Sequence, residues 1–204
     1  MDYPVFKEEM KSSYTILIPD MLPIHFKLII NILKKYGYHV ELLQTSTRAV
    51  VDEGLKNVHN DTCYPALLVI GQFINALKSG KYDVNRTALM LTQTGGGCRA
   101  SNYIHLLRKA LKKEFPQVPV ISLNLSGLEK GSGLSLTLPL LIKVVYAVFY
   151  GDLLMSLYNQ CKPYEIHSGE SESVREKWQE KLTTIFDKRE FIKCKKYCRM
   201  ILED

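Results

Sequence analysis

The chain of 204 residues lacks the features that mark membrane-spanning or exported proteins. It has no stretch of about 18 uncharged apolar residues, so no membrane span is expected. The longest apolar run, around Leu134–Tyr150, contains Pro139 and Lys143, which favours a buried helix. No basic segment followed by an apolar one stands at the N-terminus, and this predicts a cytoplasmic protein.

The chain contains few cysteines, and their number is odd. The five cysteines are Cys63, Cys98, Cys161, Cys194 and Cys198. An odd count without an export signal argues against a disulfide framework and leaves reduced thiols or metal ligands. Histidines are scattered without an H-E-x-x-H pair, and no G-x-S-x-G elbow exists, so a serine hydrolase is not indicated. The net charge of +6 gathers mainly in the C-terminal third, which we interpret as a solvated helix face and not a nucleic-acid site.

What the sequence does contain is an alternation of two apolar patterns. Short continuous apolar runs predict buried strands at residues 14–19, 39–43, 87–92 and 118–123. Apolar residues at helical spacing predict helices at residues 23–35, 46–58, 64–77 and 98–113. This alternation is typical of an α/β fold with a doubly wound, flavodoxin- or Rossmann-like parallel sheet of about four strands.

The pattern changes after the last strand. From Ser135 it is helical, with helices predicted at residues 135–158, 171–186 and 191–202. We therefore expect an α/β Rossmann-like domain over residues 1–134 and an appended helical segment over residues 135–204. The helical segment is expected to pack on the α/β domain, so that the two form a single structural unit.

Two cysteines stand where a predicted helix begins. Cys63 lies in Asn60-Asp61-Thr62-Cys63-Tyr64-Pro65, and a helix N-terminus lowers the pKa of a thiol. Cys98 ends the turn Gln93-Thr94-Gly95-Gly96-Gly97-Cys98-Arg99, which follows a strand. Ligation of a soft metal and nucleophilic attack both need a thiolate, whereas the simpler interpretation is a small buried thiol.

The glycine turn and the end of the fourth strand complete the candidate site. Gly95, Gly96 and Gly97 let backbone amides approach a phosphate or an inorganic sulfide, but they match neither the dinucleotide fingerprint nor the P-loop. Asn124 and Ser126 follow the fourth strand, where they either bind a ligand or cap a turn. Strand ends of a parallel sheet share one edge, so these residues are expected in one crevice.

These motifs together resemble one protein family. The Cys63 and Cys98 motifs, with Ser122-Leu123-Asn124-Leu125-Ser126-Gly127-Leu128-Glu129, look like the C-terminal, dehydratase-like region of the large 2-hydroxyacyl-CoA dehydratase activase-related proteins of anaerobic bacteria. Tyr150-Gly151-Asp152-Leu153-Leu154 and Pro163-Tyr164-Glu165 fit as well. The resemblance extends from about Tyr14 to Trp178.

The resemblance implies a function. Dehydratase subunits of this kind hold a [4Fe-4S] cluster through cysteines in Rossmann-like domains, and an ATP-dependent activase delivers a low-potential electron. It makes Cys63 and Cys98 candidate cluster ligands, with Gly95, Gly96, Gly97, Asn124 and Ser126 lining the cofactor. A third cysteine expected upstream has no counterpart here, which predicts that the chain is part of a larger protein and that the isolated chain can lack the cluster.

Two other interpretations stay open at this point. One is a non-catalytic domain that docks the activase module, or the rest of the parent protein, on the dehydratase-like core. The other is a CoA- or nucleotide-binding module that uses the glycine turn and Arg99, with an acyl-CoA as partner. If the chain belongs to an enzyme, the resemblance points to a lyase of the dehydratase type or to a component of an ATP-dependent reductase.

Overall fold

The structure is a computed structural model that describes residues 3–59, 61–93, 102–124, 134 and 137–204. Its contacts divide the chain into two compact units. Unit 1 consists of Met1–Met21 and Gly37–Ser135, and unit 2 of Leu22–Tyr36 and Leu136–Asp204. One helix from the N-terminal half is therefore grouped with the C-terminal helices.

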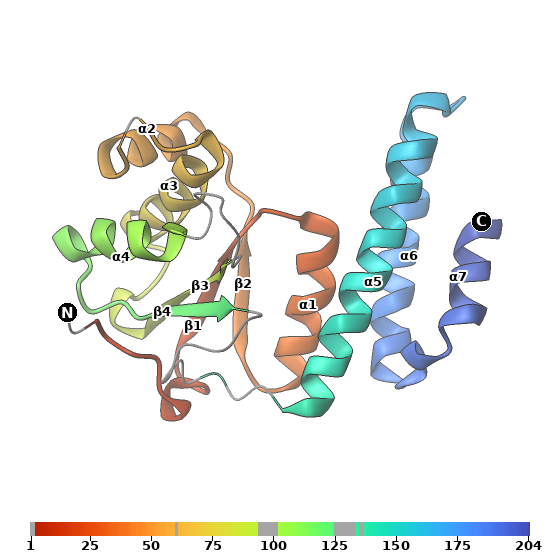
Figure 1. Ribbon diagram of the computed structural model, residues 1–204, viewed down its shortest axis with the longest axis horizontal. Coiled ribbons are helices and arrows are strands. Elements are labelled where there is room, and N and C mark those ends of the chain that lie inside the picture. The colour runs from red at the N-terminus through yellow and green to blue at the C-terminus, as the bar shows by residue number, and fades with distance from the viewer. Residues whose placement is uncertain (1–2, 60, 94–101, 125–133, 135–136) are drawn as a thin grey trace. The chain divides into compact units, whose positions relative to one another are not determined.

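Unit 1 is built on one parallel sheet of four strands (Figure 1). The strands are β1 (Thr15–Pro19), β2 (His39–Leu43), β3 (Thr87–Gln93) and β4 (Val120–Asn124). Their order is β2-β1-β3-β4, which is the order of flavodoxin-like doubly wound proteins. The predicted α/β fold class is confirmed, and all four strands lie where the apolar runs predicted them.

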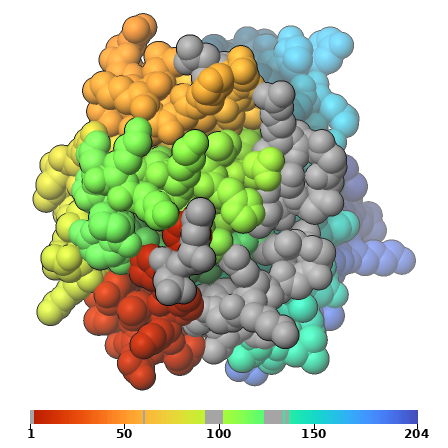
Figure 2. Space-filling view, turned by 60° about the vertical axis from the view of Figure 1, so that its left-hand side comes forward, coloured from red at the N-terminus to blue at the C-terminus, as the bar shows by residue number. Residues whose placement is uncertain are grey.

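Three helices follow β2 and β3 in unit 1. They are α2 (Arg48–Asn57), α3 (Tyr64–Lys78) and α4 (Tyr103–Glu114), with short 3₁₀ turns η1 (Glu8–Met10) and η2 (Val84–Arg86). Helices α3 and α4 and the strands share one hydrophobic core. Phe73 of α3, Leu107 of α4 and Leu89 of β3 belong to it, and each is completely buried. On the face seen in Figure 2, α4 lies between α2 and the N-terminal segment. The Tyr3 ring of that segment lies 5.2 Å from the Arg108 guanidinium on α4.

Unit 2 is helical (Figure 1). It contains α1 (Pro23–Lys35), α5 (Leu138–Cys161), α6 (Glu170–Asp187) and α7 (Cys194–Glu203), with 3₁₀ turns η4 (Lys162–Tyr164) and η5 (Glu190–Ile192). Proline at the first helical position favours the start of α1, because its missing N–H has no partner there in any case. Aromatic rings fill the centre of this unit, where Phe186 and Phe191 stack with centroids 5.1 Å apart.

Helix α1 is bound to α5 and α6 by polar and close contacts. The imidazole Nε2 of His25, a buried residue, lies 2.9 Å from Asp152 Oδ1 on α5. An added Cβ on Gly151 would come within 2.5 Å of the His25 ring, so only glycine lets the two helices approach this closely. Toward α6, the Asn31 side-chain amide donates to Thr183 Oγ1 at 3.2 Å. These contacts explain why α1 groups with the C-terminal helices.

Helix α5 buries one face and exposes another. Its buried residues include Leu140, Ala147, Tyr150 and Leu154. Its large exposed apolar side chains, from 40% to 70% accessible, recur at helical spacing and are Leu138, Leu141, Ile142, Val145, Val148 and Phe149. The expectation of a buried helix is therefore wrong for these exposed positions, although α1, α6 and α7 all contact α5.

The same helix is the membrane-span candidate among the described residues. Leu138–Tyr164 is long and apolar enough to cross a bilayer by length and composition alone. Length and composition alone support a membrane span only weakly, because a core helix of a soluble protein passes the same test. In addition, both charged residues among the first sixteen of this helix have partners in unit 2. Asp152 pairs with His25, and the Lys143 ammonium lies 5.2 Å from the Tyr36 ring.

Candidate functional site at the carboxyl edge of the sheet

The carboxyl edge of the sheet is where an open α/β fold places its ligands. Strand β1 has β2 on one side and β3 on the other, so the chain changes direction across the sheet between β1 and β3. Crevices of doubly wound folds open outside the strand ends at this point. The ends of β3 and β4 are level, since Gln93 pairs with Asn124 in the ladder.

Most of the predicted site residues fall in segments that follow these strand ends. Gly95, Gly96, Gly97, Cys98 and Ser126 lie outside the described residues. Asn124 is the last residue of β4, so its backbone stands at the predicted edge. Cys63 is the one predicted cysteine ligand whose surroundings are described.

Cys63 stands at the N-cap position of α3. Its backbone carbonyl accepts hydrogen bonds from the backbone amides of Ala66 and Leu67, at 3.1 and 3.3 Å. Its thiol is partly buried and packs against the core of unit 1. The Cys63 Sγ lies 3.0 Å from the Tyr103 hydroxyl oxygen, within hydrogen-bonding distance. The thiol is thus neither fully enclosed nor free in solvent, and it has a polar neighbour.

Tyr103 connects this thiol to the second cysteine motif. It is the first residue of α4 and is buried in the core. It stands five residues after Cys98 in the sequence. The contact between Tyr103 and Cys63 brings the first residue of α4 next to the residue that precedes α3.

A second polar group lies at the ends of β1 and β2. The backbone N–H of Asp20, directly after β1, donates to Gln72 Oε1 at 3.2 Å. The Gln72 amide in turn donates to the Thr45 carbonyl at 2.7 Å. The Asp20 Oδ1 atom is buried and has no hydrogen-bond partner in the described part of the chain. Desolvation by burial raises the pKa of the Asp20 carboxyl above its ordinary value.

The Asp20 group and the Cys63 thiol are separate parts of this edge. Gln72 lies about 13 Å from Cys63 along the axis of α3. Sequence reasoning did not identify Asp20, Gln72 or Tyr103. The position of Asp20 could have indicated a site residue, because a carboxylate directly after a buried strand lies at the carboxyl edge of the sheet, and β1 borders the change of direction there. Nothing in the sequence indicated the contact between Tyr103 and Cys63.

The other cysteines lie in unit 2. Cys161 is exposed at the end of α5, and Cys194 and Cys198 are partly buried on α7. Burial, and then the neighbouring Cys194, raises the pKa of the Cys198 thiol, which keeps it protonated. Across the described ranges there is no cluster of three or more His, Cys, Asp or Glu side chains able to hold a metal. Cys63 thus fits the role of one ligand, and any complete shell needs residues beyond those described.

Comparison of the chain with known proteins identifies no similar protein. No family model, curated protein or solved structure matches the chain. What is shown is the α/β class of the fold, with its parallel sheet of four strands and its helical unit. The resemblance to dehydratase activase-related proteins stays a hypothesis that rests on the motifs alone.

Proposed function

We propose that unit 1 is the iron–sulfur module of a low-potential electron-transfer system of the 2-hydroxyacyl-CoA dehydratase and activase type. The observation that supports this best is the contact between the Cys63 thiol and the Tyr103 hydroxyl, at 3.0 Å. It joins the loop that carries Cys63 to the helix that follows Cys98. In this proposal both thiols bind one ligand at the carboxyl edge of the sheet, where Asn124 ends β4.

Each residue has a role that follows from its chemistry. A [4Fe-4S] cluster, when bound, supplies a one-electron carrier of low reduction potential. The Cys63 and Cys98 thiolates are the proposed protein ligands, and the amides of Gly95, Gly96 and Gly97 are the proposed donors to sulfide. Asn124 and Ser126 are the residues proposed to line the crevice. The Tyr103 hydroxyl lies 3.0 Å from the Cys63 sulfur. A ligand thiolate can only accept, so in this proposal the hydroxyl donates to the sulfur, orients it and tunes its basicity.

The first test is the iron and acid-labile sulfide content after anaerobic reconstitution. We expect the parent protein to bind both, and Cys63→Ala and Cys98→Ala each to lose most of the iron. Cys161→Ala is the matched control, because Cys161 is an exposed cysteine of unit 2. Circular dichroism of each variant checks that the fold persists. A Cys63→Ala variant that keeps the iron of the parent would contradict the ligand roles, whereas a parent without iron would leave either a docking domain or a chain separated from its remaining ligands.

Tyr103→Phe tests the positioning role separately from folding. The variant removes only the hydroxyl of a buried ring, so iron content should be retained. The reduction potential should fall, because a hydrogen bond to sulfur stabilises the more negative, reduced state. A redox titration measures this. An unchanged potential would show that the hydroxyl does not donate to a ligand sulfur.

One observation favours the alternative of a docking domain. The exposed apolar face of α5 is continuous over several turns, and soluble monomers rarely expose large contiguous apolar patches. In this alternative the face contacts the activase module or the rest of the parent protein, and the cysteines are structural thiols. Protein that carries no iron and has inert Cys63 and Cys98 thiols would favour it over the cluster.

A further inference from the structure

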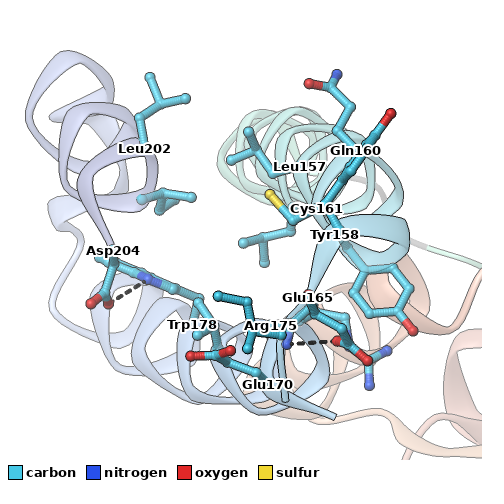
Figure 3. A pocket seen from close by; sticks show the side chains of 16 residues that line it. Leu157, Tyr158, Gln160, Cys161, Glu165, Glu170, Arg175, Trp178, Leu202 and Asp204 are labelled. Atoms are coloured by element: carbon cyan, nitrogen blue, oxygen red, sulfur yellow. Dashed lines mark hydrogen bonds between the residues drawn. The ribbon is translucent and has the colours of Figure 1, made fainter. Parts of the chain in front are cut away.

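Unit 2 contains an apolar cavity of about 540 Å³, and none of the residues that line it belongs to the candidate site in unit 1. It opens between the C-terminal end of α5, the first turns of α6 and the end of α7 (Figure 3). Leu202 faces Leu157 and Cys161 across the opening, while Trp178 and Arg175 of α6 line the floor. Trp178 is 1% exposed, and its indole N–H donates to Asp204 Oδ2 at 3.0 Å.

The size of the cavity selects the class of occupant. Small-molecule sites in proteins measure about 300–1,000 Å³ and are mostly apolar with a few polar groups. A volume of about 540 Å³ lies within this range, and most of the lining is apolar, so the cavity has the size and character of a small-molecule site.

The charges around the cavity select against anions. The acidic side chains that line it are Glu165, Glu170 and Asp204, and the one basic side chain is Arg175. The Arg175 guanidinium already pairs with Glu172 and with Glu176 on the same helix. The Arg175 Nε atom is buried and has no hydrogen-bond partner in the described part of the chain, but three carboxylates line the same cavity. A negatively charged head group would therefore meet more negative than positive groups.

The N-terminus of α6 does not change this result. Helix N-termini attract anions, but here a carboxylate of the protein itself occupies the position. The backbone amides of Gly169 and Ser171 donate to the two oxygens of Glu165 at 2.9 and 3.2 Å. Lys162 also pairs with Glu165 at 2.7 Å. The amides at this helix end are thus already used.

We infer that this cavity is a binding site for an uncharged small molecule with an aliphatic or aromatic body, and that it discriminates against the corresponding anions. Trp178 contacts the occupant at the floor, Leu157 and Leu202 cover its apolar body, and Cys161 stands at the rim. The site is independent of the cysteines proposed as cluster ligands, which belong to unit 1.

Trp178 provides the assay, because it is the only tryptophan in the chain. The protein of 204 residues is titrated at neutral pH with 1-decanol and with decanoate, each below its aggregation limit, while tryptophan emission is followed. We expect a saturable change with decanol and binding of decanoate weaker by about tenfold or more, since burying an unpaired charge is costly.

Matched variants locate the response. Val174→Phe fills the cavity and should weaken decanol binding by about tenfold or more. Val148→Phe makes the same change at an exposed position of α5 outside the cavity and should leave the affinity within about twofold. Peptide-level mass spectrometry gives a second readout, in which decanol should slow thiol labelling at Cys161 but not at Cys194.

Two outcomes would overturn the inference. The cavity is not a binding site if decanol causes no saturable change, or if Val174→Phe, folded by circular dichroism, binds decanol as the parent does. If decanoate binds as tightly as decanol, the site exists but its discrimination against anions is wrong.

Discussion

At the scale of the residue, Glu165 shows how one side chain completes a helix end. Its carboxylate accepts hydrogen bonds from Lys162 and from the backbone amides that begin α6. The Lys162 hydrogen bond, followed by that of the Gly169 amide, lowers the pKa of Glu165 from 4.5 to about 2. A group with a lowered folded-state pKa stabilises the fold above its ordinary pKa, and this contribution disappears as the pH falls toward 2.

Glu165→Gln should therefore lower the melting temperature by a few degrees near neutral pH. The difference from the parent should persist down to about pH 5 and shrink as the pH falls from 4.5 toward 2, because Glu165 becomes protonated in both states. Thermal melts across this range measure it. Glu180→Gln, which removes an exposed carboxylate from the same helix, should show no such convergence.

The contact between His25 and Asp152 gives a second prediction at this scale. Asp152→Ala removes the acceptor 2.9 Å from the Nε2 atom of a buried histidine. We expect a loss of about 1 kcal/mol in the free energy of unfolding, since Asp152 is largely exposed and water partly replaces it. Asp152→Asn keeps an acceptor oxygen and should lose less. Denaturant titrations measure both losses, and an Asp152→Ala variant as stable as the parent would show that the contact contributes nothing.

At the scale of the element, two glycines determine how closely α2 and α3 approach. An added Cβ on Gly54 would stand 2.4 Å from the Leu67 carbonyl oxygen. One on Gly71 would stand 2.0 Å from the Val50 carbonyl oxygen. Real Cβ atoms do not come this close to backbone, so both positions need glycine to keep the two helices in contact.

Gly71→Ala should therefore destabilise unit 1. Separating the backbones costs about 3 kcal/mol, and the better helix propensity of alanine offsets about 1 kcal/mol of that. The net loss of about 2 kcal/mol is measurable by denaturant unfolding. Leu55→Ala on α2 alters an exposed side chain and should change stability by no more than about 0.5 kcal/mol. A Gly71→Ala variant as stable as the parent would mean that the helices separate without cost.

At the scale of the whole molecule, the division into units does not follow the order of the chain. Helix α1 precedes β2 in sequence, but it belongs to unit 2 with α5 and α6. Besides the contacts of His25 and Asn31, the buried Gln179 side chain on α6 donates to the Ile24 carbonyl at 3.3 Å. Lys35 pairs with Asp187 at 3.1 Å. The C-terminal helices thus form a complete core only with a segment more than a hundred residues away.

A fragment of residues 136–204 should accordingly fail to melt cooperatively, because the surface of α5 and α6 that contacts α1 becomes exposed. A peptide of residues 20–38 should restore a cooperative transition when it is added. The same peptide with Leu28→Asp should not, since Leu28 is 1% exposed in the protein. Circular dichroism melts provide the measurement, and cooperative unfolding of the fragment alone would contradict the prediction.

The sequence by itself determined the elements and part of the site. Continuous apolar runs and helical spacing are local signals, because burying one face imposes a period on the chain. They placed β1 to β4 correctly, and they placed the helices to within a few residues where the structure describes the chain. The position of Cys63 at the start of α3 also follows from local signals, as does that of Asn124 at the end of β4.

Only the tertiary structure decided which distant residues meet. It brought Tyr103 to Cys63, tied Asp20 to Gln72, grouped α1 with the C-terminal helices and formed the cavity beside Trp178. It also left one face of α5 exposed where its composition had predicted burial. These features depend on contacts between segments far apart in the chain, and periodicity carries no information about which segment will pack against which.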